Sequence, residues 1–232
     1  MRIAVISDIH GNLYSLIRVL EDIDSQHVDS IVCLGDLVGY GPHPNEVIAL
    51  IKKRNILCIK GNYDASVVDN AYTFIRDTNI NIFSLPWTVE ELRVSNRYFL
   101  DNLPNSLTME VCGKTIKFVH GSHRKINEYL TNDYEKLDEV MTEFTGDILV
   151  CAHTHIPYIK DFGSKLLIND GSVGKPKNGS PDSTYIIIDI FNNATPKATI
   201  RTVAYDYRKT MKDMQMKNFP TTLIRSYESG IE

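Results

Sequence analysis

The sequence predicts an α/β fold, a four-layer α-β-β-α sandwich in which two mixed sheets pack face to face and helices lie outside. Three observations predict it. Apolar runs alternate with amphipathic segments near the N-terminus, further strand-like runs follow in the second half, and no linker, repeat or low-complexity segment interrupts the chain. We therefore expect one domain over residues 1–232, with a helical tail at about 206–230.

The N-terminal part predicts a β-α-β-α-β unit. Apolar runs predict strands at 2–6, 30–34 and 55–59, and apolar residues at helical spacing predict helices at about 13–26 and 45–54. Strands joined by helical crossovers run parallel, so their C-terminal ends share one edge of the sheet. Sites form at that edge in open α/β sheets.

The sequence after about residue 86 predicts a helix, a hairpin and a second set of strands. Thr88 and Glu91 have capping-box spacing just after Pro86, which predicts a helix that runs to about residue 101. The further elements that we expect are hairpin strands at 107–111 and 115–119, a helix at 133–144, strands at 147–151, 156–160, 165–169, 184–190 and about 198–203, a helix at 208–217 and a second short helix after it.

The composition excludes several functional classes. Hydrophobic residues make up 43% of the 232 residues, which is enough for a folded core. The net charge of −4 and the lack of a long basic run argue against a protein that coats nucleic acid. No apolar stretch approaches the roughly 20 residues of a membrane span, and we see no signal peptide. The four cysteines lie in apolar runs without close pairs, so we expect reduced thiols in a cytoplasmic protein.

Metal-ligand side chains follow the ends of the predicted strands. Asp8 and His10 are two positions apart after the first strand, so in extended backbone they point to the same side. The complete set is Asp8, His10, Asp36, Asn62, His120, His153 and His155. So many donors suggest two metals that share a bridging carboxylate, and nitrogen and oxygen donors without thiolate favour manganese, iron, zinc or cobalt. Two such ions about 3.5–4 Å apart suit phosphoryl displacement.

These motifs resemble a known family. The motifs Asp8-x-His10, Gly35-Asp36, Gly61-Asn62, His120-Gly121 and His153-Thr154-His155 resemble, in order, the five-motif signature of calcineurin-like metallophosphoesterases. The loop 169–174 and the segment 35–42 resemble the small bacterial and archaeal branch, which includes YfcE-like phosphodiesterases and dinucleoside polyphosphate hydrolases.

The resemblance implies a role for each matching residue. It implies that Asp8, His10 and His155 hold one metal, that Asn62, His120 and His153 hold a second, and that Asp36 bridges them with a hydroxide as nucleophile. The two ions are expected to be divalent or trivalent transition metals, manganese or iron, with zinc, cobalt and nickel as alternatives. An asparagine carbonyl ligates without adding negative charge, which helps an anionic phosphate approach.

One position departs from the family pattern. The family usually shows a histidine after Gly-Asn, where it assists the leaving group, but this chain has Tyr63. A phenol with a pKa of about 10 is a poor acid at pH 7 but can donate a hydrogen bond. We therefore expect anhydrides and aryl esters to be preferred over alkyl esters. His123 is a second candidate for the acid, and Asp64 either caps the next helix or orients Tyr63.

Substrate-binding candidates follow the same turns. Asn12 is either a helix cap or a phosphate contact. Tyr40 could stack on a base. Arg124, Lys175 and Lys177 are either solvated surface charges or contacts to an extended phosphate chain.

The leading hypothesis is a dinuclear phosphoesterase acting on phosphodiester or phosphoanhydride bonds of nucleotide-type substrates, including dinucleoside polyphosphates. The alternatives are a protein phosphatase, a nuclease, and a scaffold of the same fold that acts through protein contacts, as a retromer subunit does. We expect a small phosphate-containing substrate, no membrane and no nucleic-acid partner, and either a monomer or a homodimer.

Overall fold

The first of two five-stranded sheets contains the N-terminal strand. The computed structural model describes residues 1–192 and 194–231. In spatial order the strands of this sheet are β10 (Lys197–Val203), β9 (Ser183–Asp189), β1 (Arg2–Ile6), β2 (Ser30–Cys33) and β3 (Leu57–Cys58). Strands β1, β2 and β3 run parallel, as the crossover helices predict, whereas β9 and β10 are antiparallel additions.

The second sheet holds the remaining described strands. In spatial order they are β4 (Ser106–Val111), β5 (Lys114–Val119), β6 (Ile148–Cys151), β8 (Leu166–Asn169) and β7 (Tyr158–Asp161). The predicted hairpin β4–β5 is antiparallel and leads into the parallel strands β6 and β8. The C-terminal ends of β5 and β6 therefore lie together at one edge.

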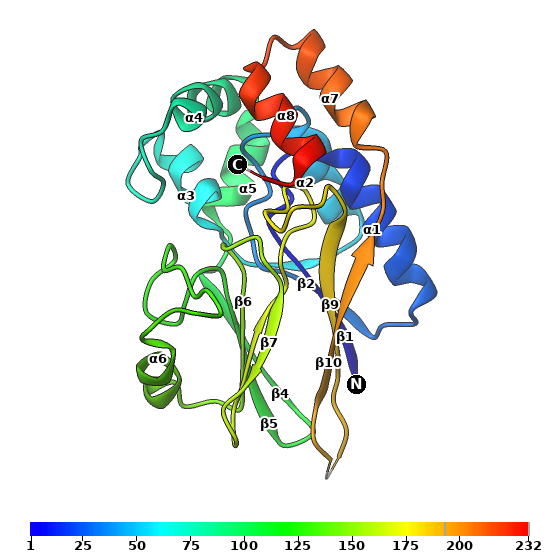
Figure 1. Cartoon of the computed structure of the whole chain (residues 1–232), viewed down its shortest axis with the longest axis vertical. Coiled ribbons are helices and arrows are strands. Elements are labelled where there is room, and N and C mark those ends of the chain that lie inside the picture. The colour runs from blue at the N-terminus through cyan, green and yellow to red at the C-terminus, as the bar shows by residue number, and fades with distance from the viewer. Residues whose placement is uncertain (193, 232) are drawn as a thin grey trace.

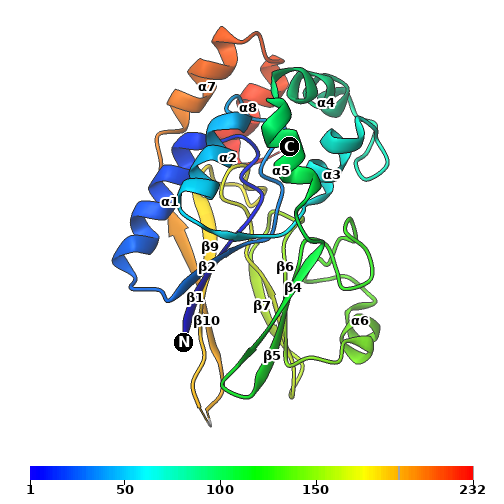
Figure 2. The same cartoon turned by 180° about the vertical axis from the view of Figure 1, so that it is seen from behind.

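The two sheets pack against each other, and helices cover their outer faces (Figures 1 and 2). Ile3 and Val5 of β1 lie in the apolar cluster between the sheets, while Ala4 and Ile6 of the same strand lie in a cluster with the helices. This alternation is the two-residue period of a strand. Helices α1 (Leu13–Ser25) and α2 (Pro44–Lys53) cover the first sheet and α6 (Leu137–Glu143) covers the second. The predicted four-layer sandwich is confirmed.

The prediction of one helix after Pro86 was wrong. Two helices occupy this region, α4 (Asn79–Glu91) and α5 (Val94–Asp101). Thr78 caps α4 by accepting a hydrogen bond from Asn81 N at 3.2 Å, and Pro86 lies inside the helix. Thr88 is not a cap, because its hydroxyl donates to Ser84 O at 2.7 Å within the same helix.

Three further helices complete the fold. The sequence did not predict α3 (Asn62–Asp69) as an element, and the helix expected at 133–144 is limited to α6. The tail forms α7 (Tyr207–Met216) and α8 (Thr221–Ser229), which lie beside α1 and α4 in both views (Figures 1 and 2). Phe219 between them packs edge-on against Trp87 of α4 at 4.6 Å. Within residues 1–192 and 194–231, no helix has the length and apolar character to cross a membrane.

Candidate metal centre

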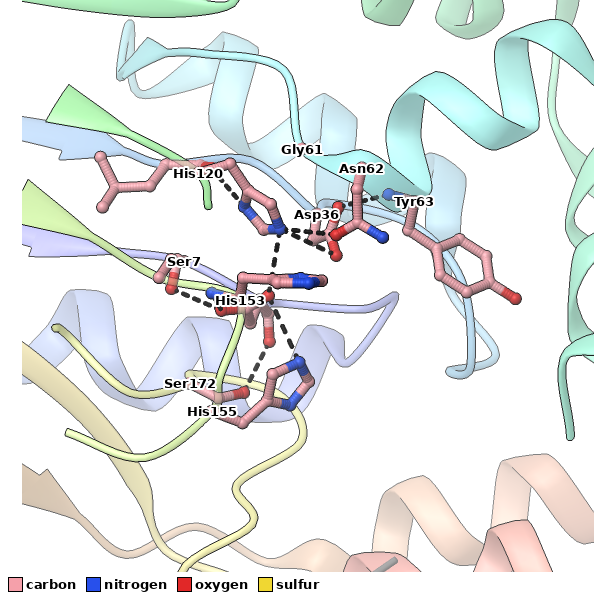
Figure 3. Close-up of polar contacts among 12 residues, drawn as sticks. Ser7, Asp36, Gly61, Asn62, Tyr63, His120, His153, His155 and Ser172 are labelled. Carbon is pink, nitrogen blue, oxygen red and sulfur yellow. Dashed lines mark hydrogen bonds and ion pairs between the residues drawn. The ribbon is translucent and has the colours of Figure 1, made fainter. Parts of the chain in front are cut away.

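The seven predicted ligands converge at one edge of the two sheets. Asp8 follows β1, Asp36 follows β2, His120 follows β5, His153 and His155 follow β6, and Asn62 begins α3. Each of these residues is at most 5% exposed. Figure 3 shows side chains from both sheets pointing toward one another. The sandwich therefore brings together residues that are far apart in the sequence.

Most of these ligands have a left-handed backbone. Positive φ angles of 48°, 47°, 52°, 68° and 61° occur at Asp8, His10, Asp36, His153 and His155. Such a conformation costs on the order of 1–3 kcal/mol per residue outside glycine and persists only where its surroundings hold it. Here Asp8 N donates to Gly35 O at 3.1 Å and His10 N donates to Asp36 O at 2.9 Å. The two strand-end turns thus hold each other in place.

One group of donors consists of Asp8, His10 and His155. The Oδ1 atom of Asp8 lies 3.4 Å from Nε2 of His155 and 3.7 Å from Nε2 of His10, and the two Nε2 atoms are 3.3 Å apart. The other carboxylate oxygen of Asp8 accepts hydrogen bonds from Ser7 Oγ at 2.9 Å and His153 N at 3.0 Å. These bonds aim Oδ1 at the histidines.

The second group consists of Asp36, His120 and His153, with Asn62 beside it. Nε2 of His120 lies 2.8 Å from Oδ1 of Asn62 and 3.4 Å from Oδ2 of Asp36. The same Oδ2 lies 3.6 Å from Nε2 of His10, which belongs to the first group. Asp36 therefore lies between the two groups, and its Oδ1 is held by Tyr63 N at 2.7 Å.

Backbone carbonyls orient three of the four imidazoles. Nδ1 of His10 lies 2.9 Å from Val38 O, Nδ1 of His120 lies 2.8 Å from Leu34 O, and Nδ1 of His155 lies 2.5 Å from Lys175 O. Donation by Nδ1 leaves Nε2 as the atom that faces the centre. Metal-ligating histidines are commonly held in this way.

Two buried polar atoms fit a cation. Among the described residues, Oδ1 of Asp8 and Nε2 of His153 have no hydrogen-bond partner. An unsatisfied buried polar atom costs about 1–3 kcal/mol, and more if it is charged. One metal ion in each donor group would satisfy the two atoms, and four imidazoles with two carboxylates and an amide suit borderline transition metals. The residues present therefore fit the ions that the sequence predicts.

The protonation states of three of the histidines also bear on metal binding. Burial lowers the pKa of His10 to about 4 and the pKa of His153 to about 3, so both are neutral at pH 7. Burial also opposes a charge on His120, but the carboxylate of Asp36 outweighs it and raises the pKa of His120 to about 10. Neutral imidazoles are the form that binds metals, so at pH 7 only His120 of these three would have to lose a proton.

Asp64 holds the two ligand-bearing turns. Its carboxylate accepts hydrogen bonds from Asp36 N at 2.8 Å, Leu37 N at 2.9 Å and Gly61 N at 3.0 Å. Burial, together with the charge of Asp36, raises the pKa of Asp64 to about 7. The prediction of Asp64 as the helix cap was wrong in position, because Gly61 is the N-cap of α3 and Asp64, at the third position of the helix, accepts the hydrogen bond from Gly61 N. The carboxylate faces the Asp36 turn. We assign it to positioning Asp36.

The variant Asp64→Asn tests this positioning role. An amide places an N–H₂ group against backbone donors, so we expect the free energy of unfolding to fall by about 2–4 kcal/mol. Metal affinity should fall about 10–100-fold, as it does when partners of ligands are removed. Chemical denaturation and metal titration measure the two effects. Asp69→Asn, at an exposed position of the same helix, is the matched control and should match wild type. Equal effects in both variants would refute the assignment.

The structure does not place the Tyr63 hydroxyl at the predicted catalytic position. Its ring points away from the ligands labelled in Figure 3, lies edge-on to His10 with ring centroids 5.8 Å apart, and packs against Tyr40 with ring centroids 4.8 Å apart. A Cβ at Gly39 would lie 2.4 Å from that ring, and Gly39 has a φ of +88°, so only glycine fits there. The hydroxyl is buried without a hydrogen-bond partner in the described part of the chain, and burial raises the pKa of Tyr63 above its ordinary value. The contribution of Tyr63 to the site is its backbone N–H, which donates a hydrogen bond to Oδ1 of Asp36.

Two further candidates line a second cavity of about 400 Å³. These are His123 and Arg124, and the ligand candidate His120 lines the same cavity. Nε2 of His123 is 3.9 Å from a carboxylate oxygen of Glu143. The guanidinium of Arg124 forms ion pairs with Glu128, with Glu139 at 3.0 Å and with Glu143 at 3.4 Å. These ion pairs favour a structural role for Arg124 over the predicted substrate contact, whereas the role of His123 as the acid stays a prediction.

Asn12 is a structural residue rather than a phosphate contact. Its Oδ1 accepts hydrogen bonds from Thr210 Oγ1 at 2.8 Å and Ser15 N at 3.3 Å. Its Nδ2 donates to Gly174 O at 2.8 Å and to the Tyr205 hydroxyl at 2.9 Å. The side chain is fully buried. Asn12 thus caps α1 and connects it through hydrogen bonds to the loop 169–174 and to the C-terminal tail.

A cavity of about 470 Å³ opens over both groups of ligands. Tyr40 lines it, as expected of a substrate contact, and Nζ of the buried Lys175 lies 5.0 Å from the centre of the Tyr40 ring. Sequence reasoning missed most of the wall, which is formed by Phe74, Ile75, Arg76, Thr78, Ile80, Asn81, Asn127 and Tyr129. These residues lie mainly in connecting segments and carry no motif, so no local signal marked them.

Comparisons with known proteins agree with this geometry. The chain is 35% identical to an uncharacterized protein of Methanocaldococcus jannaschii, with 95% of each chain covered. It is 26% identical to the phosphodiesterase YfcE of Escherichia coli, covering 79% of this chain and 85% of YfcE. The crystal structure of a metallophosphoesterase from Sphaerobacter thermophilus matches with a TM-score of 0.81 and 28% identity, covering 100% of this chain and 99% of that one.

A family model assigns the chain. The model for the calcineurin-like phosphoesterase superfamily domain matches residues 1–193, which include every ligand in both groups. The chain therefore belongs to the calcineurin-like phosphoesterase superfamily and is a metal-dependent phosphoesterase.

Proposed function

We propose that this protein uses two metal ions to hydrolyse phosphodiester or phosphoanhydride bonds of nucleotide-type substrates. The observation that carries the proposal is the pair of buried donor groups with Oδ2 of Asp36 between them, 3.4 Å from His120 and 3.6 Å from His10. The similarity to YfcE, which is named a phosphodiesterase, supports the same class of reaction.

The chemistry follows from the donor set. Asp8, His10 and His155 would hold one ion, Asn62, His120 and His153 the other, and Asp36 both. Bound ions of this type activate water and neutralise the charge of a phosphate. Hydrolysis then forms a P–O bond to the water oxygen and breaks the bond to the leaving oxygen, which departs with the electron pair. Nδ1 bonds to carbonyls keep the imidazoles aimed at the centre throughout.

The cavity supports a substrate that joins a phosphate to an aromatic group. Among the described residues that line it, the only carboxylate belongs to the ligand Asp36, whereas Arg76 and Lys177 contribute positive charge. Tyr40, Phe74 and Tyr129 present aromatic rings to the same space. The positively charged side chains would bind the anionic part of one small molecule, and the aromatic rings would pack against its aromatic part.

The proposal is tested by metal-dependent hydrolysis of bis-p-nitrophenyl phosphate. The manganese-loaded protein should release p-nitrophenol, treatment with a chelator should abolish the rate, and added manganese should restore it. A protein that binds no manganese and releases no p-nitrophenol would contradict the proposal and favour a scaffold role.

A further inference from the structure

An arginine outside the ligand set lies near the centre, on an aromatic ring that contacts a ligand. The ring of Tyr129 lies against the ring of His153, with centroids 4.0 Å apart. On the Tyr129 ring lies the guanidinium of Arg76, with Cζ 5.2 Å from the ring centre. Such a cation–π contact limits the positions of an otherwise flexible side chain. Arg76 is exposed on the wall of the cavity, one ring away from a metal ligand.

The segment that carries Arg76 is attached to the centre. The carbonyl of Phe74 accepts a hydrogen bond from Nδ2 of Asn62 at 3.1 Å, while Oδ1 of the same amide faces His120. The carbonyl of Arg76 accepts a hydrogen bond from Nδ2 of Asn81 at 2.8 Å. The same segment therefore orients a ligand amide and presents a guanidinium. The backbone that carries Arg76 is therefore attached to the metal centre.

The place of Arg76 outside the ligand set decides what it can bind. Arg76 lines the same cavity as His10, Asp36 and His153 but belongs to neither donor group. Its guanidinium therefore faces a part of the cavity where a bound substrate would place a group other than the phosphate held by the ligands. A planar guanidinium forms two parallel hydrogen bonds with a phosphate, and charge-assisted bonds are stronger than neutral ones.

We propose that Arg76 binds the phosphate next to the one that is cleaved, so that the preferred substrates are phosphoanhydrides with at least two linked phosphates. Tyr129 is the positioning residue for Arg76. This inference rests on the proposed function and narrows its substrate class. A diester with a single phosphate leaves Arg76 without a ligand.

The test compares two substrates in the manganese-loaded full-length protein. Arg76→Ala should raise KM for diadenosine tetraphosphate at least about tenfold, because one charge-assisted contact is lost. KM for bis-p-nitrophenyl phosphate, which has no second phosphate, should rise several-fold less than KM for diadenosine tetraphosphate. Arg76→Lys should give an intermediate KM, since it keeps the charge but loses the planar fork. Arg208→Ala is the matched control, because Arg208 lies 5.4 Å over Tyr207 outside the cavity, and it should change neither KM.

Variants of Tyr129 test the positioning role. Tyr129→Leu removes the stacking ring and should raise KM for diadenosine tetraphosphate with little change in kcat, whereas Tyr129→Phe keeps the ring and should retain the wild-type KM. An unchanged KM for diadenosine tetraphosphate in Arg76→Ala, or an equal rise for both substrates, would overturn the inference. So would a wild-type protein that cleaves the diester but not the tetraphosphate. A wild-type protein inactive on both would instead refute the proposed function itself.

Discussion

Replacing Asp36 with alanine is expected to lower kcat/KM for bis-p-nitrophenyl phosphate by about a thousandfold or more. The carboxylate oxygen removed is the one that lies between the two donor groups, 3.4 Å from His120 and 3.6 Å from His10. Its loss removes a shared ligand and the negative charge that holds a cation there, and metal catalysis supplies a large part of the rate in such sites. Steady-state kinetics and the metal content of the purified variant measure the effect.

The control is Asp69→Ala, which changes an exposed carboxylate on the helix that begins at Asn62. It should keep the wild-type rate and metal content. Circular dichroism must show that Asp36→Ala is folded. A folded Asp36→Ala protein with wild-type metal content and a rate within tenfold of wild type would contradict the assignment of Asp36 to both groups.

The second large effect concerns the leaving group. We expect kcat/KM for anhydrides and aryl esters to exceed kcat/KM for phosphoserine by about 10²–10⁴-fold, the range that a general acid contributes. An alkoxide needs a proton as it leaves, whereas a phosphate or phenolate does not. The Tyr63 hydroxyl points away from the ligands labelled in Figure 3, and Nε2 of His123 lies 3.9 Å from a carboxylate oxygen of Glu143, in a second cavity that His120 also lines. Parallel kinetics on the three substrate classes measure the preference.

Tyr63→Phe separates this explanation from its alternative. Removing a buried hydroxyl that has no hydrogen-bond partner among the described residues should leave kcat/KM within about twofold on every substrate. A loss of tenfold or more would show that the phenol donates a hydrogen bond during catalysis. Equal kcat/KM on phosphoserine and on a nucleoside polyphosphate would refute the predicted preference.

The ligands could be predicted from the sequence because strand ends place them. Parallel strands put their C-terminal ends at one edge, and the residues after β1, β2, β5 and β6 meet there. Donor type and order along the chain then indicated two ions. The prediction of extended backbone at Asp8 and His10 was wrong, because both residues have positive φ angles. Aspartate and histidine keep this conformation where the surrounding turns hold them, so a strand pattern could not indicate it.

Substrate contacts were harder to predict because long-range partners decide them. Asn12 could cap a helix or bind a phosphate, and its bonds to Gly174 and Thr210 in the folded chain decide for the structural role. Arg124 was equally ambiguous until Glu139 and Glu143 were found beside it. Arg76 belongs to no sequence motif. Its place near the site follows only from the folded chain, in which Tyr129 contacts both Arg76 and His153.

The predicted start of the helix was wrong because a local sequence signal was overridden by packing. Thr88 and Glu91 match a capping box, but Thr78 provides the actual cap ten residues earlier and the helix continues through Pro86. A proline removes one helical hydrogen bond, and burial of Leu85 and Thr88 on the inner side offsets that loss. Tertiary packing thus decided where the helix begins.

The central claim is that seven buried donors form two metal sites in one chain. Native mass spectrometry of the purified protein, supported by elemental analysis after manganese loading, counts the ions directly. We expect two ions per chain in wild type and about one in His155→Ala, because the group of Asp36, His120 and His153 remains complete. A saturated wild-type protein that holds one ion or none would contradict the account.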